Sequence, residues 1–361
     1  MNDSSQMILI GIGGAGAAIA RGVNRAYGGN LRHLTADTDA STDTDGSPFA
    51  LIGGDRLSGH GTGGDIVTAR LAAEDSIGVL DESLEGVRLA VIVTALGGGA
   101  GGGITLEAVK HLSERGIPSV VFATTPFTFE GENRQRAARG IRSMIEEAAN
   151  ATFFLPLDKL VSGIDNMDEA LRRAVDTVAT GITFFWRLVE KPGYLRLDVE
   201  RIRHLLAKSG RGRFAAVTVQ GPDRAKEAVD ALVRAETLTT GSAGVRSMLI
   251  GVLAGEDLRL SEIEVIAGGI RGAFGERADF ELATVNDEAT FCGRISVVAM
   301  LFESSAEEAA AKAKGQARPK RSVLASGVSG RGRFANVVPT IWRDEDLDTP
   351  TYLRKGVSLD F

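Results

Sequence analysis

The sequence predicts an α/β protein with a parallel-sheet domain, a long central helix, a second, smaller α/β domain and a disordered C-terminal tail. Over residues 7–166, short apolar β-branched runs alternate with amphipathic stretches, which is typical of a parallel sheet covered by helices. A long helical pattern follows over residues 168–188, and after Glu303 the composition shifts to Ala, Lys, Arg, Gly and Ser. The length of 361 residues, with 43% apolar and 24% charged residues, fits a globular chain of roughly two domains.

Residues 7–166 contain the elements of the first domain. We expect buried strands at Met7–Ile10, Leu89–Thr94, Ser119–Ala123 and Thr152–Leu155. We expect helices between and after them at Ala17–Tyr27, Val67–Leu80, Leu106–Arg115 and Asn133–Asn150. Because strand and helix alternate, the strands are predicted to be parallel, with helices on both faces.

Residues 167–361 are divided into four predicted parts. Residues 167–209 hold the central helix, the breaker Pro192-Gly193 and a helix at Asp198–Lys208. Residues 210–303 form the smaller domain, with strands at Ala215–Gln220, Val245–Ala254, Phe280–Val285 and Ile295–Phe302, and helices near Pro222–Ala235 and Ser261–Phe274. Residues 304–343 are a predicted flexible linker, which has seven basic and no acidic residues between Lys312 and Arg333. Residues 344–361 alternate acidic and apolar residues, which favours docking on a partner.

Composition argues against several classes of protein. The net charge of −6 gives no reason to expect specific nucleic-acid binding, which usually accompanies a basic domain. The single cysteine, Cys292, cannot form an internal disulfide, and the four histidines have no metal-ligand spacing, so no metal site is predicted. The sequence has no basic leader and no apolar run of about 18 residues, so we expect a cytoplasmic protein without a transmembrane segment.

Glycine is unusually frequent in this chain. Sixteen of the 45 glycines lie in three windows, Gly11–Gly16, Gly53–Gly64 and Gly97–Gly103. The first window fits G-x-G-x-x-G between a predicted strand and helix, where glycine lets the backbone approach a pyrophosphate at the helix N-terminus. Close strand–helix packing is the alternative. The third window also follows a buried strand, and six glycines in seven positions would weaken ordinary packing, which favours phosphate binding.

The second glycine window, which ends in Gly59–Asp65, precedes a predicted helix and offers a third set of N–H donors. By itself it fits a mobile surface loop equally well. Together with two glycine-rich turns at the carboxyl edge of one parallel sheet, it predicts a cradle for the phosphates of one nucleotide. None of these loops ends in the Lys-Ser/Thr of a P-loop, so a Walker-type NTPase is excluded.

With these motifs the chain resembles the FtsZ/tubulin superfamily, and in particular its bacterial FtsZ branch. The resemblance covers most of the chain. It rests on the segments GIGGAG (11–16), DTDA (37–40), GHGTGGD (59–65), GGGAGGG (97–103), TPFTFEG (125–131), LPLDKL (155–160) and DLDTPTYLRK (346–355). Their order along the chain is the order of the family's motifs.

The resemblance implies a GTP-binding protein that polymerises head to tail into filaments, with hydrolysis where two subunits meet. It further implies bound GTP or GDP, Mg²⁺ held through phosphates and water, a location at the division site, and membrane-tethering or division proteins that bind residues 344–361. The implied nucleotide contacts are Gly13, Gly14, Ala15, Gly16, Ala17, Ala18, Asp37, Asp39, Thr62, Gly63, Gly64, Gly98, Gly99, Ala100, Gly101, Gly102, Gly103, Pro126, Glu130, Arg134 and Asp176. Glu130 would bind the ribose. Its alternative role is structural, because the dipole at a helix N-terminus favours an acidic side chain.

The chain departs from the family pattern at the phosphates and the base. Ala100 and Gly102 replace two threonines of the tubulin signature, so the phosphates would depend on backbone N–H groups. On the central helix, Leu171 and Val175 replace a base-stacking aromatic residue and a base-reading acid or amide, and Leu157 replaces a second base-reading asparagine. Asp176 is the adjacent acid, turned about 100° around the helix, and it also fits a solvated helix charge.

The loop before Asp198–Lys208 also departs from the family pattern, because N-x-D-x-x-D aligns with Arg196, Asp198 and Arg201. We predict that Asp198, helped by Glu200, supports slow hydrolysis, and that the two arginines strengthen contacts between subunits. Asp198 could equally be a helix N-cap. Two other functions stay open: a nucleotide-dependent filament that does not hydrolyse, and a Rossmann-type oxidoreductase with Asp37 or Asp39 behind the G-x-G-x-x-G turn.

Overall fold

The computed structural model describes residues 6–28, 31–42, 47–161, 163–164, 166–191, 193–206, 210–239, 244–303, 341–342 and 345–346. Residues Met1–Ala310 form one compact unit and Ala311–Phe361 a second. In the second unit the structure describes β11 (Ile341–Trp342) and β12 (Glu345–Asp346), which pair antiparallel. The predicted linker and the rest of the predicted tail lie outside the described residues.

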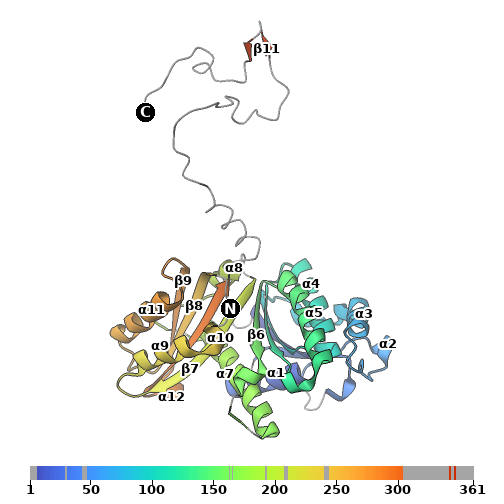
Figure 1. The fold of residues 1–361 in the computed structure, drawn as a ribbon, viewed down its shortest axis with the longest axis horizontal. Coiled ribbons are helices and arrows are strands. Elements are labelled where there is room, and N and C mark those ends of the chain that lie inside the picture. The colour runs from blue at the N-terminus through green and yellow to red at the C-terminus, as the bar shows by residue number, and fades with distance from the viewer. Residues whose placement is uncertain are drawn as a thin grey trace. The chain divides into compact units, whose positions relative to one another are not determined.

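A ten-stranded sheet runs through the first unit in the order β3-β2-β1-β4-β5-β6-β7-β10-β8-β9 (Figure 1). Its strands are β1 (Met7–Ile12), β2 (His33–Asp37), β3 (Phe49–Leu51), β4 (Leu89–Ala95), β5 (Ser119–Thr125), β6 (Ala151–Pro156), β7 (Arg211–Gln220), β8 (Val245–Ala254), β9 (Asp279–Asn286) and β10 (Arg294–Glu303). Neighbouring strands are parallel except at β10, which is antiparallel to both β7 and β8. The predicted α/β fold class is confirmed.

Helices pack on both faces of the sheet, and α7 lies between the two halves of the unit (Figure 1). The longer helices are α1 (Gly13–Tyr27), α3 (Ile66–Ser76), α4 (Gly99–Glu114), α5 (Glu132–Ala148), α7 (Met167–Glu190), α8 (Val199–Leu206), α9 (Arg224–Arg234) and α11 (Leu260–Phe274). The four-residue helices are α2 (Gly54–Leu57), α6 (Leu157–Leu160), α10 (Glu236–Thr239) and α12 (Glu288–Phe291). Within the described ranges, no helix has both the length and the apolar character needed to cross a membrane.

The sequence prediction differs from the structure at the glycine windows and at one edge of the sheet. Helices α1 and α4 begin at Gly13 and Gly99, inside the glycine windows and several residues before their predicted starts. Strands β2 and β3 were not predicted, because each is short and contains few apolar β-branched residues. The pairs Thr152↔Arg211 and Phe153↔Gly212 join β6 to β7, so one sheet continues across the predicted domain boundary. The predicted domain limits stay predictions.

The core is organised around helix α7. Along β1, Met7 and Leu9 face the cluster that contains α7, whereas Ile8 and Ile10 face the helices on the other side of the sheet. This alternation follows from the two-residue period of a strand. Phe185 and Trp186 of α7 are each 1% exposed and pack in a cluster that includes residues of strands from both halves. Because these rings are buried against strands of both halves, their packing attaches both halves of the sheet to helix α7.

Asn166 caps the N-terminus of α7, where its side chain accepts a hydrogen bond from the backbone N–H of Glu169 at 2.9 Å. We expect Asn166→Ala to lower the free energy of unfolding by about 1 kcal/mol, because an orphan N–H loses its acceptor. Denaturant unfolding measures this change. Asn166→Asp keeps an acceptor and should unfold like the wild type, whereas an alanine variant as stable as the wild type would show that the cap contributes nothing.

Candidate nucleotide-binding site

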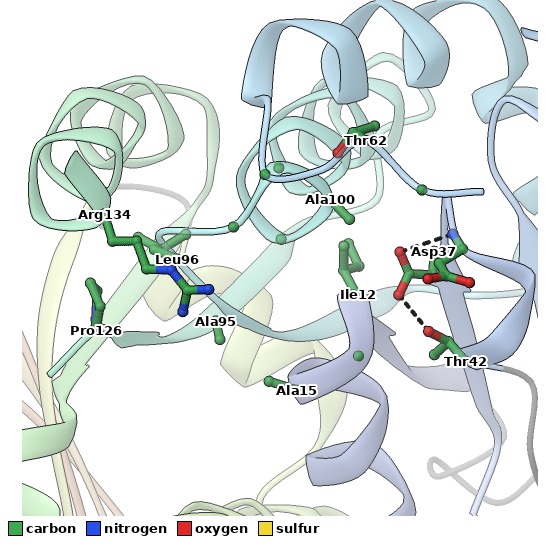
Figure 2. A pocket seen from close by; sticks show the side chains of 18 of the residues that line it. Ile12, Ala15, Asp37, Thr42, Thr62, Ala95, Leu96, Ala100, Pro126 and Arg134 are labelled. Carbon is green, nitrogen blue, oxygen red and sulfur yellow. Dashed lines mark hydrogen bonds between the residues drawn. The ribbon is translucent and has the colours of Figure 1, made fainter. Parts of the chain in front are cut away.

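A cavity of about 730 Å³ lies where β1, β2, β4, β5 and β6 end. Its volume is in the usual range of small-molecule sites, about 300–1,000 Å³. Figure 2 shows Arg134 and Pro126 on one side of this cavity, and Asp37 and Thr42 on the other. The lining residues are Ile12, Gly13, Gly14, Ala15, Asp37, Thr38, Asp39, Thr42, His60, Gly61, Thr62, Gly63, Gly64, Ala95, Leu96, Gly98, Gly99, Ala100, Gly101, Thr124, Pro126, Phe127, Glu130, Arg134, Leu157, Met167 and Leu171.

Two helix N-termini lie at this cavity without capping side chains. Helix α1 begins at Gly13 and α4 at Gly99; neither has a side-chain cap or an acidic residue in its first turn. The first N–H groups of such helices have no intrahelical acceptor, and the helix dipole favours a negative charge there. The N-terminal ends of α1 and α4 are therefore suited to bind phosphate oxygens.

Helix α3 begins beside the same cavity, and its N-cap is Asp65, whose side chain accepts from the N–H of Val67 at 2.9 Å. A hydrogen bond from Thr68 is the largest cause that lowers the pKa of Asp65, so this carboxyl is ionised at neutral pH. The loop Gly61–Gly64 before it lines the cavity. The α3 terminus thus contributes loop backbone to the cavity, while its own dipole is already balanced by Asp65.

The glycines of the third window have a packing reason that the sequence did not indicate. A Cβ atom at Gly99 would lie 2.2 Å from Thr62 Oγ1, and one at Gly101 would lie 2.1 Å from the carbonyl oxygen of Ala95. At Gly103 a Cβ atom would lie 2.6 Å from the backbone nitrogen of Arg70 on α3. Alternate glycines therefore let α4 approach β4 and α3 more closely than any side chain allows.

The β2 side of the cavity is acidic and internally hydrogen-bonded. Asp37 is 4% exposed; its Oδ1 accepts from the N–H of Thr38 at 2.7 Å and its Oδ2 from Thr42 Oγ1 at 2.7 Å (Figure 2). Hydrogen bonds from Ser41 lower the pKa of Asp39, which is therefore ionised at neutral pH. A backbone bridge pairs Asp39 with His60, so both residues lie on this wall.

The opposite side of the cavity holds an ion pair at the start of α5. Glu130 Oε1 accepts from the backbone N–H of Phe127 at 2.8 Å, and Glu130 Oε2 accepts from Arg134 Nη1. Glu130 thus closes the turn before α5 and holds the guanidinium of Arg134 at the cavity. The predicted contact between Glu130 and a ribose stays a prediction.

The structure brings most of the predicted nucleotide contacts together in one cavity, but six of them do not line it. A Cβ atom at Gly16 would lie 2.4 Å from the carbonyl oxygen of Val93, so glycine there lets α1 pack on β4. Asp176 is exposed on α7. The residues outside the lining are Gly16, Ala17, Ala18, Gly102, Gly103 and Asp176. A role in nucleotide binding stays a prediction for the residues inside and outside the lining alike.

Twelve lining residues were not among the predicted nucleotide contacts, and three of them show what the sequence could and could not indicate. His60 lies inside the second glycine window, between Gly59 and Gly61, so that motif could have included it. Thr42 lies just beyond the Asp37–Ala40 segment and binds Asp37. Met167 lines the cavity only because α7 starts there, and no local sequence signal marks it.

The predicted catalytic residues lie at the opposite end of β4 from the cavity. Glu200 pairs with Arg88, which directly precedes β4, whereas Ala95 at the other end of β4 lines the cavity. Seven residues of strand at about 3.3 Å each separate the two ends by roughly 20 Å. Asp198 and Glu200 therefore cannot reach the cavity of their own chain.

Asp198 and Arg201 already have partners within the chain. Asp198 Oδ1 accepts from the backbone N–H of Arg201 at 2.8 Å, which is the N-cap arrangement of α8. Arg201 Nε and Nη2 donate to the two carboxylate oxygens of Glu281 at 2.8 and 2.9 Å. These hydrogen bonds raise the pKa of Arg201.

The fold and the cavity define an α/β protein whose cavity, at the carboxyl edge of the parallel strands, is suited to an anionic ligand. Residues 6–165 match the family described as "Tubulin/FtsZ family, GTPase domain", and residues 210–303 match "FtsZ family, C-terminal domain". Together these two matches span well over half of the chain. The chain belongs to the Tubulin/FtsZ family.

The individual proteins to which this chain is similar include FtsZ and CetZ proteins. The cell division protein FtsZ of Pseudomonas putida is 28% identical over 286 aligned residues, and the match covers 77% of this chain and 72% of that protein. An empty FtsZ dimer from M. jannaschii superposes with a TM-score of 0.76 at 23% identity, over 82% of this chain and 88% of that chain. A GTPγS-bound protofilament of CetZ2 from Haloferax volcanii has a TM-score of 0.71 at 20% identity, over 87% of this chain and all of that chain. Both solved structures have the same fold as this chain.

Proposed function

We propose that this protein binds GTP in the cavity and polymerises head to tail into filaments of the cell-division machinery, with slow hydrolysis at the junction of two copies. The separation of Asp198 from the cavity is the observation that supports this most. Because a single chain holds its carboxylates roughly 20 Å from its own cavity, only a second copy stacked end to end can bring them to the nucleotide.

Exposed apolar side chains at both places fit such stacking. Phe129, Met167 and Leu171, at or beside the cavity, are 68%, 45% and 43% exposed. Tyr194 and Leu195, in the loop before α8, are 66% and 43% exposed. Clusters of exposed apolar residues are typical of interaction surfaces, and stacking two copies would bury both clusters together.

The residues support slow hydrolysis. Phosphoryl transfer depends mainly on positioning the attacking water and neutralising charge, and Asp198 is the acceptor that would orient the water. One Asp198 oxygen already caps α8, and Arg201 binds Glu281. Bound Mg²⁺, held through phosphates and water, would neutralise phosphate charge. Ala100 and Gly102 cannot assist it, because neither residue has a hydroxyl group.

Asp198→Asn is expected to lower GTP turnover at least about tenfold, because an amide orients water less well than a carboxylate. Asparagine is as good an N-cap as aspartate, so α8 should stay intact and GTP-dependent sedimentation should persist. Phosphate release and pelleting measure the two effects. The matched control is Asp223→Asn, the same change on an exposed residue at the start of α9. Wild-type turnover in Asp198→Asn would contradict the role of Asp198.

A filament or scaffold that binds nucleotide without hydrolysing it is the second candidate. The cap bond of Asp198 and the Arg201–Glu281 ion pair favour it, because both leave the predicted catalytic loop partly engaged within its own chain. Pelleting with GTP and without phosphate release would support this second function over the first.

The predicted tail, residues 344–361, completes the proposal. We infer that it binds membrane-tethering or division proteins and so directs the filament to the division site. Its alternating acidic and apolar residues support this role. Most of the tail lies outside the described residues.

A further inference from the structure

We propose that the cavity accepts purine nucleoside triphosphates with little discrimination between guanine and adenine. This inference rests on the proposed nucleotide-binding function and deepens it. Selectivity between purines depends on which part of the cavity holds the base, which side chains form its walls, and what hydrogen bonds those side chains can still make.

The base end of the cavity lies on the side of β5, β6 and α7. The uncapped helix termini at Gly13 and Gly99, which suit phosphates, follow β1 and β4. From β4 the lining continues across β5 to β6, two strand spacings or about 10 Å further along the sheet. There the lining residues are Thr124, Pro126, Phe127, Leu157, Met167 and Leu171, with Glu130 and Arg134 at the start of α5. A nucleotide with its phosphates at α1 and α4 therefore places its base against a wall of mainly apolar side chains.

Helix α7 presents aliphatic side chains to this end. Leu171 and Met167 line the cavity. Val175, one turn further along α7, packs against α1 instead: its Cγ1 lies 3.4 Å from the position that a Cβ atom of Gly22 would occupy. Asp176 is exposed and does not line the cavity. No described residue on α7 thus offers the cavity a carboxylate.

The nearby carboxylates already have hydrogen-bond donors. Glu130 uses one oxygen for the N–H of Phe127 and the other for Arg134. Asp158, outside the lining, accepts from the backbone N–H and the hydroxyl of Thr128 at 3.1 and 2.7 Å. Each carboxylate therefore already accepts hydrogen bonds from donors of its own chain, which makes it a weaker acceptor for the base.

Discrimination between purines depends on hydrogen-bond partners. Guanine presents the N1–H and the 2-amino group as donors, whereas adenine has an acceptor at N1 and carries its amino group at C6. A site built to hydrogen-bond one of them rejects the other strongly, but an apolar wall distinguishes molecules of similar shape only weakly. The base end of this cavity is of the second kind, so phosphates and purine size determine affinity.

Competition against a fluorescent GTP analogue, with the full-length protein and GTP, ATP, inosine triphosphate or tripolyphosphate as competitors, tests the inference. We expect the three nucleotides to compete within about tenfold of one another. A preference for GTP over ATP greater than about tenfold would overturn it. Failure of every nucleotide to bind would instead contradict the proposed function, on which the inference rests.

A variant of α7 tests the position of the base directly. Leu171→Asp places a carboxylate on the exposed, cavity-lining wall, where it can accept from both guanine donors, and should raise the GTP-to-ATP affinity ratio at least about tenfold. The matched control is Thr177→Asp, which adds the same charge on an exposed part of α7 outside the lining and should leave the ratio unchanged. An unchanged ratio in Leu171→Asp, or an equal increase in Thr177→Asp, would overturn the assignment of this wall to the base.

Discussion

Ala15→Glu is expected to lower the affinity for GTP by at least about a hundredfold, because the new carboxylate would lie within a few ångströms of the phosphates. Ala15 is exposed, lines the cavity and lies in the first turn of α1, which has no acidic residue. A glutamate there is favoured by the helix dipole, so the fold should be as stable as in the wild type. Anisotropy of a labelled GTP analogue measures the affinity, and thermal unfolding measures the stability.

Ala15→Gln is the matched control, because it adds the same bulk without charge and should lose much less affinity. Undiminished binding by Ala15→Glu would show that phosphates do not lie at the N-terminus of α1.

The same variant tests whether the active site is shared between copies. Ala15→Glu retains the loop that carries Asp198 but binds GTP poorly in its own cavity. Asp198→Asn still binds GTP but lacks the carboxylate. In a mixed filament, each cavity of the second variant can meet an intact loop of the first. GTP turnover of the mixture should therefore exceed that of either variant alone, and turnover no higher than that of Asp198→Asn would contradict a shared site.

Gly101→Ala is expected to lower the free energy of unfolding by about 2–3 kcal/mol, a typical cost of overpacking. A methyl group at this position would lie 2.1 Å from the carbonyl oxygen of Ala95 and 3.1 Å from Thr94 Oγ1. The hydroxyl of Thr94 also donates to the carbonyl of Gly101 at 2.9 Å, so α4 cannot move away without losing that bond. Denaturant unfolding measures the change.

Gly98→Ala is the control in the same glycine run. Its φ of −99° is accessible to alanine, and a Cβ atom there would have no neighbour within 4 Å. We expect its stability to equal that of the wild type or to rise by up to about 1 kcal/mol, because alanine restricts the unfolded chain. Equal stability of Gly98→Ala and Gly101→Ala would show that the close approach at Gly101 is not limiting.

Local patterns predicted much of the fold and the position of the cavity. The buried strands at Met7, Leu89, Ser119 and Thr152 were found from apolar runs, because a strand buried on both faces carries its signal in consecutive residues. The glycine windows likewise marked the edge of the sheet at which the cavity lies, because a parallel sheet brings its strand-to-helix turns to one edge.

Other features depended on contacts between distant segments. The sequence could not show that Gly99, Gly101 and Gly103 face neighbouring segments at contact distance, since the atoms they approach belong to Thr62, Ala95 and Arg70. Nor could it show that Val175 faces α1 while Leu171 faces the cavity, because the rotation of α7 is set by the residues packed around it.

The fold class, the family and the three glycine-rich loops that line the cavity could thus be predicted from the sequence, because they depend on local periodicity and on motifs within short segments. The positions of Asp198 and Glu200 at the far end of β4, and the fact that Met167 and Leu171 line the cavity while Val175 does not, could be learned from the folded chain alone. Both depend on how α7 and α8 pack against the sheet, and no local pattern encodes such packing between residues distant in the chain.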